Sequence, residues 1–177
     1  MKRLLLLACL GLISCSSPPA QQSSVEVDAA GFRLKPDPVL TPGANDPSVV
    51  IDDLTIAELC RSGYTKSLRH DGNKVRAVSA STRKAIFAEY GIDPKDYPPR
   101  TFEIDHLCSL ELGCNNSPKN LWPQAYTSSI WNAHRKDRLE GVLHGMVCRG
   151  DITLREAQVA ISTDWIAAYE KYIGDDG

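Results

Sequence analysis

The chain has 177 residues, of which 42% are hydrophobic and 24% are charged, and its formal net charge is −2 at pH 7. This length suits one domain with short extensions, and it excludes a large barrel or a multidomain enzyme. The composition excludes a wholly disordered chain and a polytopic membrane protein, and the net charge excludes a protein that coats nucleic acid through bulk positive charge.

The N-terminus has the pattern of an export signal. A basic start precedes an apolar run over 4–13, which is too short to span a bilayer. The motif LISC at 12–15 resembles the lipobox of bacterial lipoproteins, whose cysteine is lipidated and becomes the mature N-terminus. We therefore expect residues 1–14 to be a lipoprotein signal peptide and Cys15 to carry the lipid, so that the domain is exported and anchored to the bacterial envelope. A plain secretory peptide that is cut nearby, or an uncleaved anchor, is the alternative.

Residues 15–54 are rich in Pro, Ser, Ala and Asp and have no sustained periodicity. This composition predicts a tether, although a short strand around 49–51 could belong to the edge of the domain. The domain itself is expected at 55–177. Within it, residues 61–84 carry seven Lys and Arg against Asp71 alone, a local net charge of +6 in an otherwise acidic protein.

This basic segment is large enough for several phosphate contacts, and a solvated surface stretch is the alternative. The residues expected to contact nucleic acid are Arg61, Lys66, Arg69, Lys74 and Arg76.

Four cysteines remain once Cys9 of the signal and Cys15 are set aside, and an exported domain favours their pairing as disulfides. Three pairings exist. Cys108 and Cys114 bracket a short loop and can bridge locally, which leaves Cys60 and Cys148 to join distant parts of the domain. A structural zinc site is the alternative, but no Cys-x-x-Cys motif occurs in the chain.

Periodicity predicts the secondary structure of the domain. A helix is expected from 81 or 82 to about 90, a strand at 101–107, a turn at 115–119 and a short strand at 120–122. An amphipathic helix follows over about 129–147, and a last helix begins near Thr153 and breaks around 162–164.

The candidate catalytic residues lie at the end of the first predicted strand. Asp105 and His106 lie there, and Asn120 opens the second strand. A carboxylate oxygen suits a hard divalent cation, and an imidazole can accept a proton near neutral pH. Phosphodiester hydrolysis needs both, because the metal neutralises charge on the phosphate while the base takes a proton from the attacking water.

Four motifs extend this pattern, namely EIDHL at 103–107, LELG at 110–113, NLWPQ at 120–124 and KDRLE at 136–140. Together they resemble the HNH nucleases of the ββα-metal (His-Me finger) superfamily, in a branch found in exported bacterial proteins. The resemblance implies an α+β fold, in which a short hairpin and a helix form a ββα-metal core with flanking helices and disulfides. It departs from the common pattern at Cys108 and Cys114, where a bridge would stiffen the loop beside the base.

The resemblance also implies roles for individual residues. His106 would be the general base, Asp105 a metal ligand, and Asn120 the residue that holds the loop so that the imidazole points at the water. Asn132, His134 and Asp137 compete for the role of helix ligand. Because Asn132 falls within the apolar stripe of the helix and the other two lie opposite it, His134 is preferred, with Asp137 second. Lys136, in the same helix, is grouped with the expected nucleic-acid contacts.

The implied function is a metal-dependent endonuclease that cleaves DNA, or RNA, outside the cytoplasm. Mg²⁺ is the expected cofactor, with Mn²⁺ and Zn²⁺ as alternatives, and a monomer is expected; whether an immunity protein exists is left open. Two other classes compete with this one. One is a catalytically inactive envelope lipoprotein that binds nucleic acid or another anion, and the other is a purely structural envelope lipoprotein.

Overall fold

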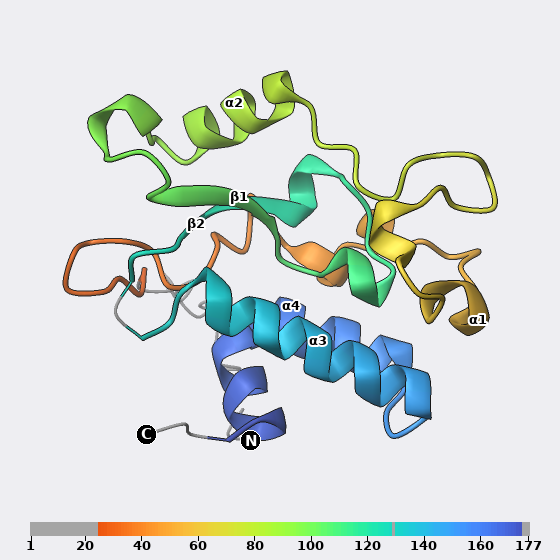
Figure 1. Ribbon diagram of the computed structural model, residues 1–177. Coiled ribbons are helices and arrows are strands. Elements are labelled where there is room, and N and C mark those ends of the chain that lie inside the picture. The colour runs from red at the N-terminus through yellow and green to blue at the C-terminus, as the bar shows by residue number, and fades with distance from the viewer. Residues whose placement is uncertain (1–24, 129, 175–177) are drawn as a thin grey trace, which may run out of the picture.

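The computed structural model describes residues 25–128 and 130–174, so the predicted signal peptide and Cys15 lie outside the described residues. The fold is α+β, with a two-stranded antiparallel sheet and four α-helices in the described part of the chain (Figure 1). In chain order the elements are α1 (Ile56–Leu59), α2 (Ala80–Glu89), β1 (Phe102–His106), β2 (Leu121–Ala125), α3 (Ala133–Arg149) and α4 (Leu154–Tyr172).

Side-chain caps determine where the helices begin. The Ser79 side chain accepts a hydrogen bond from the Thr82 amide at the start of α2, and Thr153 forms a capping box with Glu156 at the start of α4. Asn132 caps α3, which therefore begins four residues later than predicted. The expected break in the last helix is confirmed, because Asp164 has non-helical backbone angles.

The hairpin pairs β1 with β2 so that Ile104 lies opposite Pro123 and His106 lies opposite Leu121. The second strand continues beyond the predicted 120–122. A proline is tolerated there because each strand of a two-stranded sheet has one free edge, where a missing N–H costs no ladder bond.

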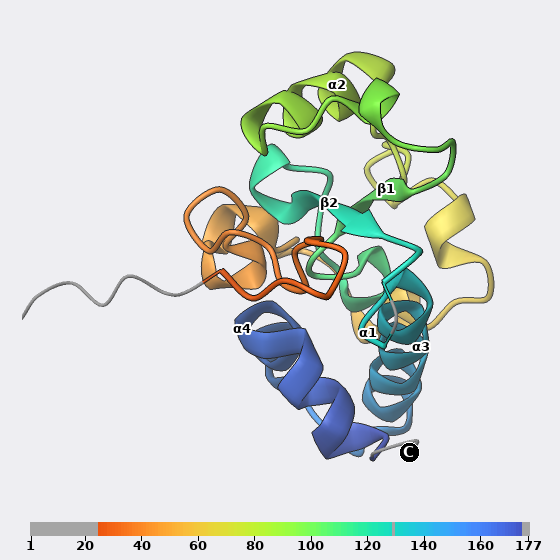
Figure 2. The same cartoon turned by 90° about the vertical axis from the view of Figure 1, so that its left-hand side faces the viewer.

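The hairpin lies between α2 and the α3–α4 pair (Figure 1), and the same order of layers is visible after a quarter turn (Figure 2). Ile104 and Leu121 pack with Ile86 of α2 in a small apolar cluster. The larger core is formed by α3, α4 and the loop that follows β1, with Trp122, Leu139 and Trp165 buried in it.

The described part of the predicted tether packs on the domain, so the predicted boundary at residue 55 is wrong. Ala44 and Val49 are fully buried, and Lys35 forms an ion pair with Asp164 of α4 at 2.7 Å. The isolated bridge between Val50 and Cys114 fits the expected strand at the domain edge. The segment lacks the periodicity of an α-helix or strand because it packs as turns, extended backbone and two short 3-10 helices at Gly43–Asn45 and Pro47–Val49.

Both predicted disulfides are present. Cys60 pairs with Cys148 and Cys108 with Cys114, with Cα–Cα distances of 5.7 and 5.8 Å. Two disulfides fit an extracellular or otherwise oxidising location. Within residues 25–128 and 130–174, no helix combines the length and the apolar character needed to cross a membrane.

Replacing Val49 by Ala tests whether the N-terminal segment, residues 25–54, is part of the core. Because Val49 is fully buried, we expect Val49→Ala to lower the free energy of unfolding by about 2 kcal/mol in urea titrations. Val39→Ala is the matched control, since Val39 is 85% exposed in the same segment and its truncation should change stability by less than about 0.5 kcal/mol. Equal effects of the two substitutions would contradict this packing.

Candidate functional site

Asp105 and His106 lie side by side at the end of β1, and their side chains meet different parts of the molecule. Asp105 contacts α3 through Lys136, whereas His106 contacts Asn116 in the loop between the two strands. This follows from the alternation of side chains along a strand, which sends neighbouring residues to opposite faces. The strand end therefore presents a carboxylate on one side and an imidazole on the other.

Asn116 fixes the orientation of His106. Its Oδ1 lies 3.1 Å from His106 Nε2 and also accepts a hydrogen bond from the Ala77 amide, while its Nδ2 donates to the Val75 carbonyl at 2.8 Å. The two backbone groups determine which end of the amide faces the ring. Because an amide oxygen can only accept, the network assigns the proton to Nε2 and leaves the lone pair on Nδ1.

His106 is neutral at physiological pH. Only 3% of the residue is exposed, and burial lowers the pKa of His106 to about 4, although the Asp105 charge opposes this effect. A neutral imidazole with a free Nδ1 lone pair is in the state required of a proton acceptor.

Asn120 is fully buried and closes the loop that follows β1. Its Oδ1 accepts a hydrogen bond from the Cys108 amide at 2.8 Å, and its Nδ2 donates to the carbonyls of Cys108 and Asn115, both at 2.9 Å. Together with the Cys108–Cys114 disulfide, these bonds hold both ends of the loop. Such contacts are those expected of a residue that holds the loop beside the histidine.

Lys136 is buried beneath this strand end. It is 1% exposed, and its Nζ lies 2.7 Å from Asp105 Oδ2 and 2.5 Å from Glu140 Oε1 and donates to the His106 carbonyl at 2.7 Å. Burial alone would lower the pKa of Lys136, but the two carboxylates outweigh it and raise the pKa. The prediction that Lys136 contacts nucleic acid is therefore wrong, because α3 turns this side chain inward.

Two further carboxylates surround Asp105. Burial raises the pKa of Glu103, and the charges of Asp105 and Asp137 raise it further, although the Tyr126 hydroxyl donates to Glu103 at 2.5 Å. Partial burial, and then the Asp105 charge, also raises the pKa of Asp137. The second oxygen of Glu103, Oε1, is buried without a hydrogen-bond partner. This side of the strand end thus carries closely spaced negative charge.

His134 and Asp137 are both exposed on α3. The His134 ring lies against Tyr126, with centroids 5.2 Å apart, whereas Asp137 lies near enough to Asp105 for the two charges to interact. Asp105, His134 and Asp137 do not form a compact cage. Among the described residues, the three-residue group whose ligand atoms all lie within 4.8 Å of one another is Cys60, His144 and Cys148.

The basic segment lies partly beside the site. Arg76 is exposed, and its positive charge acts on both His106 and Asp137, although burial is the main cause that lowers the pKa of His106 and raises that of Asp137, so Arg76 lies near both faces of the strand end. Lys66 and Lys74 are also exposed. Arg69 forms ion pairs with acidic neighbours, and Arg61 donates to Ser67 and Leu68. The role of these residues in nucleic-acid binding stays a prediction.

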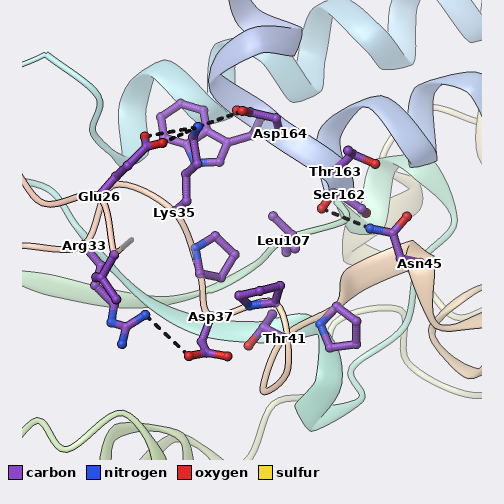
Figure 3. A pocket seen from close by; sticks show the side chains of 15 residues that line it. Glu26, Arg33, Lys35, Asp37, Thr41, Asn45, Leu107, Ser162, Thr163 and Asp164 are labelled. Carbon is purple, nitrogen blue, oxygen red and sulfur yellow. Dashed lines mark hydrogen bonds and ion pairs between the residues drawn. The ribbon is translucent and has the colours of Figure 1, made fainter. Parts of the chain in front are cut away.

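A cavity of about 350 Å³ lies elsewhere, between the N-terminal segment and α4 (Figure 3). Its charged side chains neutralise one another, since Arg33 pairs with Asp37, and Lys35 pairs with Glu26 and Asp164. Neither Asp105 nor His106 lines it. We therefore place the candidate site at the strand end.

No protein-family model, curated protein or solved structure matches this chain. The chemistry of the site is therefore what points to a function. Sequence reasoning missed Asn116 and Glu140, because an asparagine in a polar turn and a glutamate on a helix usually face solvent. The spacing of Glu140 four residues after Lys136 is the one signal that pairs them.

Removing the buried ammonium group tests the ion-pair network. Lys136→Met leaves Asp105 and Glu140 facing each other without a cation, so we expect the free energy of unfolding to fall by about 3 to 5 kcal/mol at neutral pH. Lys119→Met is the control, because Lys119 pairs with Asp46 at the surface and its loss should cost less than about 1 kcal/mol. Similar urea midpoints for the two variants would contradict the network.

Proposed function

We propose that this protein is a metal-dependent endonuclease that hydrolyses phosphodiester bonds, with DNA as the principal substrate and RNA as the second substrate to be tested. The observation that carries the proposal is the neutral, oriented His106 beside a group of carboxylates at the end of β1. The order of strand, loop, strand and helix around them agrees with the HNH-like core implied by the sequence motifs.

The residues present fit a hard divalent cation. Lys136 holds one oxygen of Asp105 and thereby fixes the direction of the other. Glu103 has a buried oxygen without a partner, and Asp137 lies near both carboxylates. Because these oxygens do not form a closed cage, Asp105 with Asp137 or His134 would hold the cation, and water and phosphate oxygens would complete its shell. Mg²⁺ is bound in this way in many phosphoryl-transfer sites, and Mn²⁺ or Zn²⁺ are the alternatives.

When bound, the cation supplies neutralisation of the charge that develops on the phosphate and the leaving oxygen. The chain's own residues perform the remaining steps. His106 Nδ1 takes a proton from the attacking water, and the resulting imidazolium is stabilised by the Asn116 oxygen at Nε2 and by the Asp105 charge. Asn120 keeps the loop closed around the histidine.

Arg76 would bind the substrate phosphate. It is exposed, and its charge reaches both His106 and Asp137. Lys66 and Lys74, exposed in the same segment, extend the positive charge along a bound strand. We place this activity outside the cytoplasm, on a protein anchored through Cys15, because the disulfides fit an oxidising location and the N-terminus has the lipobox pattern.

Plasmid cleavage tests the proposal. Supercoiled plasmid and an RNA of matched length are incubated with the oxidised full chain in Mg²⁺, Mn²⁺, Zn²⁺ or EDTA. We expect cleavage that needs a metal, and His106→Ala should reduce its rate by at least about 100-fold because the general base is lost. His70→Ala is the matched control, since His70 pairs with Glu58 and Asp53, neither of which belongs to the candidate site. Full activity in a folded His106→Ala variant would refute the assignment.

Replacing Asn116 tests how the histidine is positioned. Asn116→Ala removes the acceptor at Nε2, so we expect kcat to fall about 10-fold to 100-fold with KM nearly unchanged. Nitrogen NMR of His106 should show the proton on Nε2 in the parent protein and a mixture of tautomers in the variant. Asn115→Ala is the control, because Asn115 also bonds the loop but does not touch His106. An equal loss of kcat in both variants would mean that Asn116 acts only on the loop.

A further inference from the structure

Cys60, His144 and Cys148 form a second group with metal-binding chemistry, at the contact between α1 and α3. Cys60 is the C-cap residue of α1, and His144 and Cys148 are one turn apart on α3, so both face the same neighbour. The Sγ atoms and one ring nitrogen all lie within 4.8 Å of one another. This site contains no residue of the proposed nuclease site.

The histidine is oriented as a metal ligand would be. His144 Nδ1 lies 2.8 Å from the Glu111 carbonyl oxygen, and since a carbonyl only accepts, Nδ1 carries the proton. The Nε2 lone pair then faces Cys148, whose Sγ is 3.5 Å away. A ligating imidazole usually donates its other N–H to a carbonyl or carboxylate in this manner.

In the oxidised protein the two sulfurs are bonded to each other and offer no thiolate. We propose that a dithiol or phosphine reductant converts this group into a binding site for a soft divalent cation such as Zn²⁺. The reductant supplies two electrons and is oxidised, and the S–S bond breaks to give two thiols. The cation then binds both sulfurs as thiolates, with release of two protons, and His144 Nε2 is the third ligand. Water takes the fourth position.

The geometry allows this exchange with little movement. Two ligands of a tetrahedral site with bonds of about 2.3 Å are about 3.8 Å apart. His144 Nε2 already lies 3.5 Å from Cys148 Sγ, and the two Sγ atoms can separate to this spacing by side-chain rotation once the bond between them has opened. All three residues are partly exposed, so a reductant and a cation can reach them. Cys108 and Cys114, by contrast, are fully buried, and no histidine joins them in such a group in the described part of the chain.

The cation would replace one cross-link by another. Bound between Cys60 and the α3 pair, it would keep α1 against α3 after the disulfide has opened. Soft sulfur and imidazole ligands favour Zn²⁺ over Mg²⁺, so this site and the oxygen-rich strand end would select different metals. The inference is independent of the proposed nuclease activity.

Cobalt binding tests the proposal. The full chain carrying Cys9→Ser and Cys15→Ser is reduced with a phosphine under argon and titrated with Co²⁺. We expect thiolate-to-cobalt charge-transfer absorption and the visible bands of a tetrahedral site, both removed by Zn²⁺ and absent from the oxidised protein. His144→Ala should weaken cobalt binding at least about tenfold, whereas His70→Ala should leave it unchanged.

Four outcomes would overturn the proposal. One is a reduced protein that keeps its native circular dichroism but shows no charge-transfer band. A second is a His144→Ala variant that binds cobalt with the same affinity as the parent protein. A third is loss of the charge-transfer band in folded Cys108→Ser/Cys114→Ser protein. In both cases the ligands would be different residues. The last is reduction that unfolds the chain without recovery of the native spectrum when Co²⁺ is added, since cobalt would then bind an unfolded chain.

Discussion

The candidate site depends on the ion pairs that the buried Lys136 ammonium forms. It contacts Asp105, Glu140 and the His106 carbonyl at once, and so fixes α3 against the end of β1. A desolvated cation requires its partners, so neither the strand end nor the helix can shift alone without leaving charge unpaired. The positions of Asp105 and His106 are in this sense set by a residue that need not touch a substrate.

The loop after β1 adds a second level of restraint. Asn120 and the Cys108–Cys114 disulfide hold its ends, and Asn116 binds the imidazole from within it. These bonds hold the imidazole orientation and the assigned tautomer before any ligand arrives. The carboxylates of Glu103 and Asp137 near Asp105 have raised pKa values, because of their burial and of the mutual repulsion of their negative charges. A bound cation would relieve this repulsion.

Local patterns predicted much of this fold, and tertiary packing explains what they missed. Helices α2, α3 and α4, the hairpin and both disulfides follow from periodicity, caps and loop length, which act over a few residues, whereas the four-residue helix α1 was not expected. The burial of Val49 does not, because its partners lie in distant segments and the surrounding sequence has no period. Lys136 was misjudged for a related reason, since a helical wheel gives its direction but not the carboxylate that strand β1 places opposite it. The HNH-like identity of the core and the catalytic roles remain proposals.

Asn116 joins the loop after β1 to the basic segment. Asn116 binds the backbone of Val75 and Ala77, the two residues on either side of Arg76. Asn116 therefore helps to position both the exposed Arg76 and the buried His106, although the two lie 30 positions apart in the sequence. A graft that replaced 61–84 with another basic sequence would also replace the support of the imidazole. The exposed side chains of Lys66 and Lys74 can be exchanged for other basic side chains without disturbing this support, whereas the backbone conformation of 75–77 must be kept together with the loop.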